Sequence, residues 1–111
     1  MSSARAARFD QFQLLNAARC NTAFAHGVEG WDPEYWALAI AGEAGELCNL
    51  LKKVVRGDFT LEEKRQAILS EVADVITYCD LLNSNLHAST GEELMRKFNE
   101  VSKRIGYSLD K

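Results

Sequence analysis

The chain has 111 residues, of which 47% are hydrophobic and 26% charged, and its formal net charge is −3. This is the composition of an ordinary globular protein, and the length predicts one domain that spans residues 1–111. The acidic balance argues against a nucleic-acid-binding protein, which normally carries a basic face. An acidic protein can still bind a polyphosphate if a divalent cation lies between the two negative charges.

The cysteines and the hydropathy pattern indicate a compartment. Cys20, Cys48 and Cys79 are widely spaced and form no Cys-x-x-Cys pair, so neither a disulfide framework nor a zinc site of the usual spacing is expected. We expect buried thiols in a reducing, cytoplasmic environment. No apolar run approaches the roughly 20 residues that a membrane span needs, so no membrane partner is expected. The Arg- and Ala-rich start could be read as a transit peptide, but helical spacing favours a first helix.

That first helix is expected from about Arg5 to Ala25. One face of it carries mostly apolar residues at helical spacing: Phe9, Phe12, Leu15, Ala18 and Thr22. Two glycines, Gly27 and Gly30, then predict a loop.

A second helix is expected to begin after Asp32, a good N-cap residue, with Pro33 in its first turn. It is predicted to run to about Arg56. Gly57 follows at the position where a left-handed glycine commonly ends a helix.

Thr60 and Glu63 have the spacing of a capping box and predict a third helix, which continues to about Leu86. Ser89 or Thr90 is expected to cap a fourth helix that ends before Gly106. Strand signals are nearly absent. The sequence therefore predicts an all-α four-helix bundle, and its small size favours assembly into a dimer or a larger oligomer.

Carboxylates interrupt the apolar faces of the two central helices. The second helix has an apolar row at Trp36, Ile40, Leu47, Leu50 and Val54, and Glu43 occupies the missing position of that row. In the third helix the row is Ile68, Val75, Tyr78 and Leu82, with Glu71 at the missing position. Glu46 and Asp74 each follow three residues later.

Ionised carboxylates on facing helices repel one another and are costly to bury. A hard divalent cation such as Mg²⁺ removes both problems, because it takes oxygen ligands and keeps room for substrate phosphates. Either acidic pair alone would be an ordinary solvated helix face. The coincidence of both pairs predicts a metal site of Glu43, Glu46, Glu71 and Asp74.

These residues resemble a known family. Gly42-Glu43-Ala44-Gly45-Glu46-Leu47, followed by Glu71-Val72-Ala73-Asp74-Val75, resembles the E-x-x-E…E-x-x-D signature of the MazG-like nucleoside triphosphate pyrophosphohydrolases. That family groups with the all-α dimeric dUTPases and dCTP pyrophosphatases. The likeness covers the second and third helices well and the fourth loosely.

The resemblance implies Mg²⁺-dependent hydrolysis of a nucleoside triphosphate to a monophosphate and pyrophosphate, with Mn²⁺ as a possible substitute. The four carboxylates would hold the metal, and Glu46, in preference to Glu43, would activate the attacking water. The resemblance also implies a homodimer or homotetramer in which a neighbouring subunit completes the site.

Residues that would bind the substrate are less sharply indicated. Tyr78 lies where related dCTP pyrophosphatases place a substrate-contacting tyrosine, and Trp31 is preferred to Trp36 and Phe12 for stacking on a base. Basic and polar side chains that could contact phosphate or sugar are Lys53, Lys97, Asn99, Lys103 and Arg104.

Two other interpretations stay open at this point. A phosphoribosyl-ATP pyrophosphohydrolase would use a similar carboxylate set on a different substrate. A non-catalytic helical interaction module would instead pair the carboxylates with basic residues of a partner.

Overall fold

The computed structural model describes residues 4–108, and this part of the chain contains four helices and no strand. They are α1 (Ala4–Ala23), α2 (Pro33–Arg56), α3 (Leu61–Asn85) and α4 (Thr90–Ile105). The predicted all-α class is confirmed. None of the four described helices combines the length and the apolar character that crossing a membrane requires. The first three residues of the possible transit peptide lie outside the described residues.

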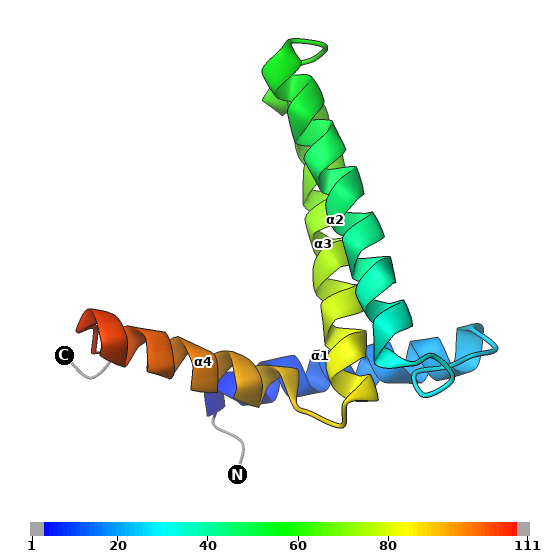
Figure 1. The fold of residues 1–111 in the computed structure, drawn as a ribbon, viewed down its shortest axis with the longest axis vertical. Coiled ribbons are helices and arrows are strands. Elements are labelled where there is room, and N and C mark those ends of the chain that lie inside the picture. Colours follow the sequence, from blue (N-terminus) through cyan, green and yellow to red (C-terminus); the bar gives the residue numbers. More distant parts are fainter. Residues whose placement is uncertain (1–3, 109–111) are drawn as a thin grey trace.

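The helices form two parts, a long hairpin and a base (Figure 1). In the hairpin, α2 and α3 lie antiparallel along most of their length, whereas α1 and α4 lie across its lower end. The radius of gyration is 16.7 Å, well above the roughly 13 Å of a compact domain of about 100 residues. The hairpin therefore leaves much of its surface uncovered within one chain.

Local signals set the ends of the last three helices as predicted. Asp32 has an extended backbone before Pro33, although its side chain makes no capping hydrogen bond, and Gly57 ends α2 with a φ of 87°. Thr60 and Glu63 form the reciprocal capping box of α3. Ser89, rather than Thr90, caps α4 by accepting a hydrogen bond from the backbone N–H of Glu92.

The prediction for α1 was wrong in two respects. The helix ends at Ala23, and a turn follows in which the N–H of Gly27 donates to the carbonyl of Phe24. Its buried residues are Ala6, Asn16 and Cys20. The predicted apolar face is largely exposed, with Leu15 at 71%, because polar anchors on the opposite face turn the helix toward α3.

Those anchors form a buried polar junction of α1, α3 and α4. Asp80 is 2% exposed and accepts hydrogen bonds from the side-chain amide of Asn16, at 2.9 Å, and from the hydroxyl of Thr90. Next to it, Gly91 lies so close to α1 that a Cβ would come within 2.3 Å of the carbonyl oxygen of Ala6. Hydrogen bonding and close backbone approach together fix the base beneath the hairpin.

The cysteines correct another expectation. All three are free, as predicted, but Cys20 alone is buried, while Cys48 and Cys79 are exposed on α2 and α3. Apolar neighbours in the sequence predicted that Cys48 and Cys79 are buried, but both cysteines lie on the outer faces of the hairpin.

Candidate functional site

The apolar rows predicted for α2 and α3 face each other in the hairpin. Trp36 is buried at its lower end, and the remaining members are half-buried along its length: Ile40, Leu47, Leu50, Val54, Ile68, Val75, Tyr78 and Leu82. Glu43 and Glu71 are half-buried in the same rows. The two carboxylates are thus held at the helix interface by the side chains above and below them.

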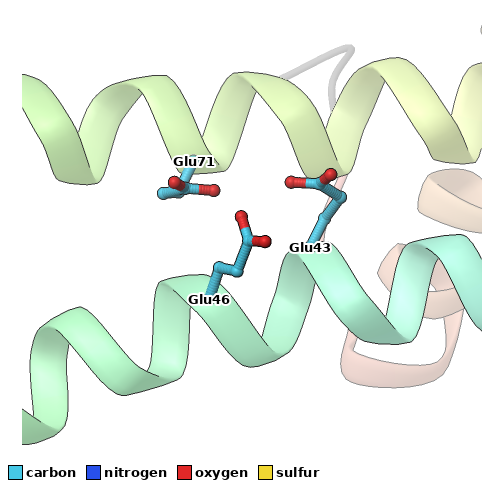
Figure 2. Close-up of side chains that lie close together, drawn as sticks. All are labelled: Glu43, Glu46 and Glu71. Carbon is cyan, nitrogen blue, oxygen red and sulfur yellow. The ribbon is translucent and has the colours of Figure 1, made fainter.

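Three of the four predicted metal-binding carboxylates lie together. Glu43 and Glu46 on α2 and Glu71 on α3 point toward one another, as Figure 2 shows, and each offers an oxygen within 4.8 Å of the others. One oxygen of Glu43 and one of Glu71, Oε2 in both, are buried and have no hydrogen-bond partner. Asp74, which is exposed, lies outside this three-residue group.

The electrostatics of the group match its crowding. Partial burial raises the pKa of Glu43, and the negative charges of Glu46 and Asp74 raise it further. Burial likewise raises the pKa of Glu71, with the charge of Glu46 as the next cause. Asp74 also contributes to raising the pKa of Glu71, so its carboxylate lies near enough to act on both half-buried glutamates.

The donor set fits a hard divalent cation. Unpartnered, half-buried carboxylate oxygens that converge from two helices are the kind of ligand that Mg²⁺ and Mn²⁺ take. Such a cation would offset the mutual repulsion that raises these pKa values.

The two glycines beside the carboxylates do not serve helix packing within the chain. A Cβ at Gly42 or Gly45 would meet no atom within 4 Å. Small residues beside a site allow either close approach of another helix or access of a ligand, and the open surface on this side of α2 agrees with access.

A cleft of about 620 Å³ opens next to the carboxylates, where α1, the α1–α2 loop, α2 and α3 meet. Asp74 lines it together with Arg19 and Tyr78. Because Asp74 also acts on the pKa values of Glu43 and Glu71, the carboxylate group and the cleft are adjoining parts of one region.

Aromatic side chains form one wall of this cleft. The imidazole of His26 stacks on the indole of Trp31 with ring centroids 4.0 Å apart and on Phe24 at 5.6 Å. The ring centroid of Trp36 lies 4.7 Å from that of Trp31 and 6.2 Å from that of Tyr78. A flat aromatic ligand would find a stacking surface here.

The predicted substrate-binding residues are thereby divided. Trp31 and Tyr78 line the cleft, whereas Lys53 is half-buried near the far end of α2. Lys97, Asn99, Lys103 and Arg104 lie on α4, which packs on α1 and α3 and makes no contact with α2 in the described chain. Lys97 instead forms an ion pair with Glu100 at 3.1 Å.

Sequence reasoning missed several residues of the cleft. Neither His26 nor Arg19, which both line the cleft, was predicted from the sequence as a site residue. A usable signal was present, because five aromatic side chains fall within thirteen positions: Phe24, His26, Trp31, Tyr35 and Trp36.

Comparisons with protein-family models, with curated proteins and with solved structures returned no match to this chain.

Proposed function

We propose that this protein is a Mg²⁺-dependent nucleotide pyrophosphohydrolase that converts a nucleoside triphosphate and water into a nucleoside monophosphate and pyrophosphate. The observation that carries the proposal is the position of Asp74 between two features. Carboxylates with unpartnered oxygens lie on one side of it, and an aromatic cleft lies on the other. A nucleotide needs both features, since its base is flat and aromatic and its phosphates are anionic.

Each part of the substrate has a suitable environment. The nucleobase stacks in the cleft against Trp31, and Tyr78 lines the same cleft. The guanidinium of Arg19, a cation among the cleft-lining residues, pairs with phosphate oxygens. Mg²⁺, held by Glu43, Glu46, Glu71 and Asp74, would supply positive charge against the phosphates.

Water is the nucleophile, and a carboxylate of the chain acts as the general base. Glu46 is the exposed member of the carboxylate group, so it can reach solvent and accept a proton from the attacking water. The water oxygen forms a bond to the α-phosphorus, the bond between that phosphorus and the oxygen bridging the α- and β-phosphates breaks, and pyrophosphate leaves. Glu43 and Glu71 stay fixed at the helix interface, where they would act as ligands of the metal.

The same proposal includes a homodimer or homotetramer. Large apolar side chains are exposed on the open sides of α1 and α3: Phe9, Phe12, Leu14, Leu15, Leu69, Val72 and Ile76. A second copy would cover them, and a neighbouring subunit would supply the phosphate contacts that Lys97, Asn99 and Lys103 cannot supply within one chain, because α4 makes no contact with α2 in the described residues.

The test is pyrophosphate release from a panel of ribo- and deoxyribonucleoside triphosphates, with Mg²⁺ and with EDTA. We expect metal-dependent release with the monophosphate as co-product. Glu46→Gln should lower turnover by about 10² to 10⁴, the usual contribution of a general base. Glu62→Gln, an exposed glutamate at the start of α3, is the matched control and should retain activity.

Absence of release from every nucleoside triphosphate of the panel would overturn the proposed activity, and release from phosphoribosyl-ATP alone, tested separately, would favour that substrate instead. The interaction-module interpretation would then gain support if Mg²⁺ also failed to stabilise the fold.

A further inference from the structure

The loop that carries the aromatic wall is tied down by side chains rather than by regular structure. Val28 is its buried centre, with 4% exposure. The N–H of Val28 donates to the side-chain oxygen of Asn21 at 2.8 Å, and its carbonyl accepts from the indole N–H of Trp36 at 3.1 Å. These contacts come from α1 and α2, the helices that flank the loop.

The loop has a further attachment that is distant in sequence. Asn85, at the end of α3, is 9% exposed, and its side-chain amide donates to the carbonyl of Val28 at 3.0 Å. The same amide nitrogen donates to the carbonyl of Trp31 at 2.8 Å. An asparagine amide has two N–H groups, so both are used, and the need for two donors fixes the orientation of the side chain.

The amide therefore holds the backbone at Trp31 directly. The indole of Trp31 borders the cleft and stacks on His26, so a shift of this backbone moves the stacking surface. Asn85 itself is not among the cleft-lining residues.

We infer that Asn85 is a positioning residue that fixes the Trp31 wall of the cleft and thereby sets how tightly the cleft binds a nucleobase. This inference rests on the proposed nucleotide substrate, but the position of Trp31 can be measured without any turnover. It predicts an effect on substrate binding rather than on the chemical step, because Asn85 acts through Trp31 and not through the carboxylates.

The experiment compares Asn85→Ala with Asn83→Ala. Asn83 lies on the same helix two residues earlier, and its amide donates to the hydroxyl of Thr90 at 3.1 Å instead of to the loop. Asn83→Ala therefore removes one partly buried hydrogen bond and Asn85→Ala removes two, of which one is buried, and only Asn85→Ala releases the backbone of Trp31. Both are measured for tryptophan emission, acrylamide quenching and steady-state kinetics with the preferred nucleotide.

In Asn85→Ala we expect a red-shifted emission and stronger quenching, and both changes should vanish when Trp31→Phe is added. KM should rise about tenfold while kcat changes by less than about twofold, as expected when hydrogen bonds that support binding are removed. Asn83→Ala should leave emission and KM unchanged. If Asn85→Ala does not fold, Asn85→Ser, which keeps one donor, is judged by the same criteria.

Unchanged emission in the Asn85 variant would overturn the inference, and so would a fall in kcat at constant KM, which indicates only a loss of folded protein. A wild-type chain that hydrolyses no nucleotide would overturn the proposed function. In that case a Trp31-dependent red shift would still support the positioning role, and its absence would reject it.

Discussion

Glu43 on α2 and Glu71 on α3 converge across the hairpin, and each keeps one buried carboxylate oxygen without a hydrogen-bond partner (Figure 2). Charged groups in this arrangement destabilise the metal-free fold, because one buried oxygen of each has no donor and the neighbouring carboxylates repel one another. Glu71→Gln should therefore raise the melting temperature of the metal-free protein, measured in EDTA. Glu62→Gln, which removes an exposed charge from the first turn of the same helix, should leave it unchanged or lower it. A lower melting temperature for Glu71→Gln would mean that the carboxylate is a structural group.

The pH dependence of stability follows from the same pair. The pKa values of Glu43 and Glu71 are raised in the folded state. At a pH between the unfolded-state and the folded-state pKa of each group, the folded protein therefore binds more protons than the unfolded chain. Their contribution is therefore fully present below about pH 4.3, the ordinary value for glutamate, and is lost as pH rises through the raised pKa. Urea denaturation of the metal-free protein from pH 4 to pH 8 should show this loss, and Glu71→Gln should reduce it.

Glu63 provides a control of opposite sign. Its capping hydrogen bonds with Thr60 lower its pKa, so its contribution is present above the unfolded value and is lost as pH falls. Glu63→Gln should flatten the acidic side of the profile. A Glu71→Gln profile parallel to that of the wild type would contradict the assignment of the raised pKa.

Metal binding should stabilise the fold by mass action. At a Mg²⁺ concentration about 100-fold above Kd, the free energy of unfolding should rise by about 2.7 kcal/mol. A melting scan against added MgCl₂, with NaCl at equal ionic strength as the control, measures this. Glu71→Gln should weaken the response. A wild-type chain with no shift at millimolar Mg²⁺ would count against the metal site.

The buried junction at Asp80 predicts a purely structural variant. Asp80→Ala would leave the side chains of Asn16 and Thr90 without their acceptor and should cost about 3 kcal/mol in the free energy of unfolding. Asp58→Ala is the matched control, since Asp58 pairs with Arg56 on the exposed hairpin tip and such surface pairs contribute little. Equal stabilities of the two variants in urea denaturation would refute the role of Asp80.

Much of the helical framework could be predicted from the sequence. The capping box of Thr60 and Glu63, Pro33 in a first turn and Gly57 after a last turn are local signals, and each acts through the backbone within a few residues. The rows that contain Glu43 and Glu71 were also readable, because α2 and α3 keep a constant period along their shared interface.

The remainder depended on contacts between distant segments. Apolar spacing predicted the wrong buried face of α1, because polar groups determine which face of this helix packs against α3. Asn16 binds Asp80, which lies 64 positions away in the sequence. No local pattern shows that Cys79 is exposed, or that Asn85 reaches the carbonyl of Trp31.

The sequence by itself thus determined where the last three helices begin and end and which carboxylates interrupt the apolar rows of α2 and α3. The tertiary structure decided which faces are covered, and it brought three of these carboxylates within 4.8 Å of one another beside an aromatic cleft. The physical reason is range. Capping and helical periodicity act over one or two turns, whereas burial and side-chain hydrogen bonding between helices depend on how the chain packs on itself.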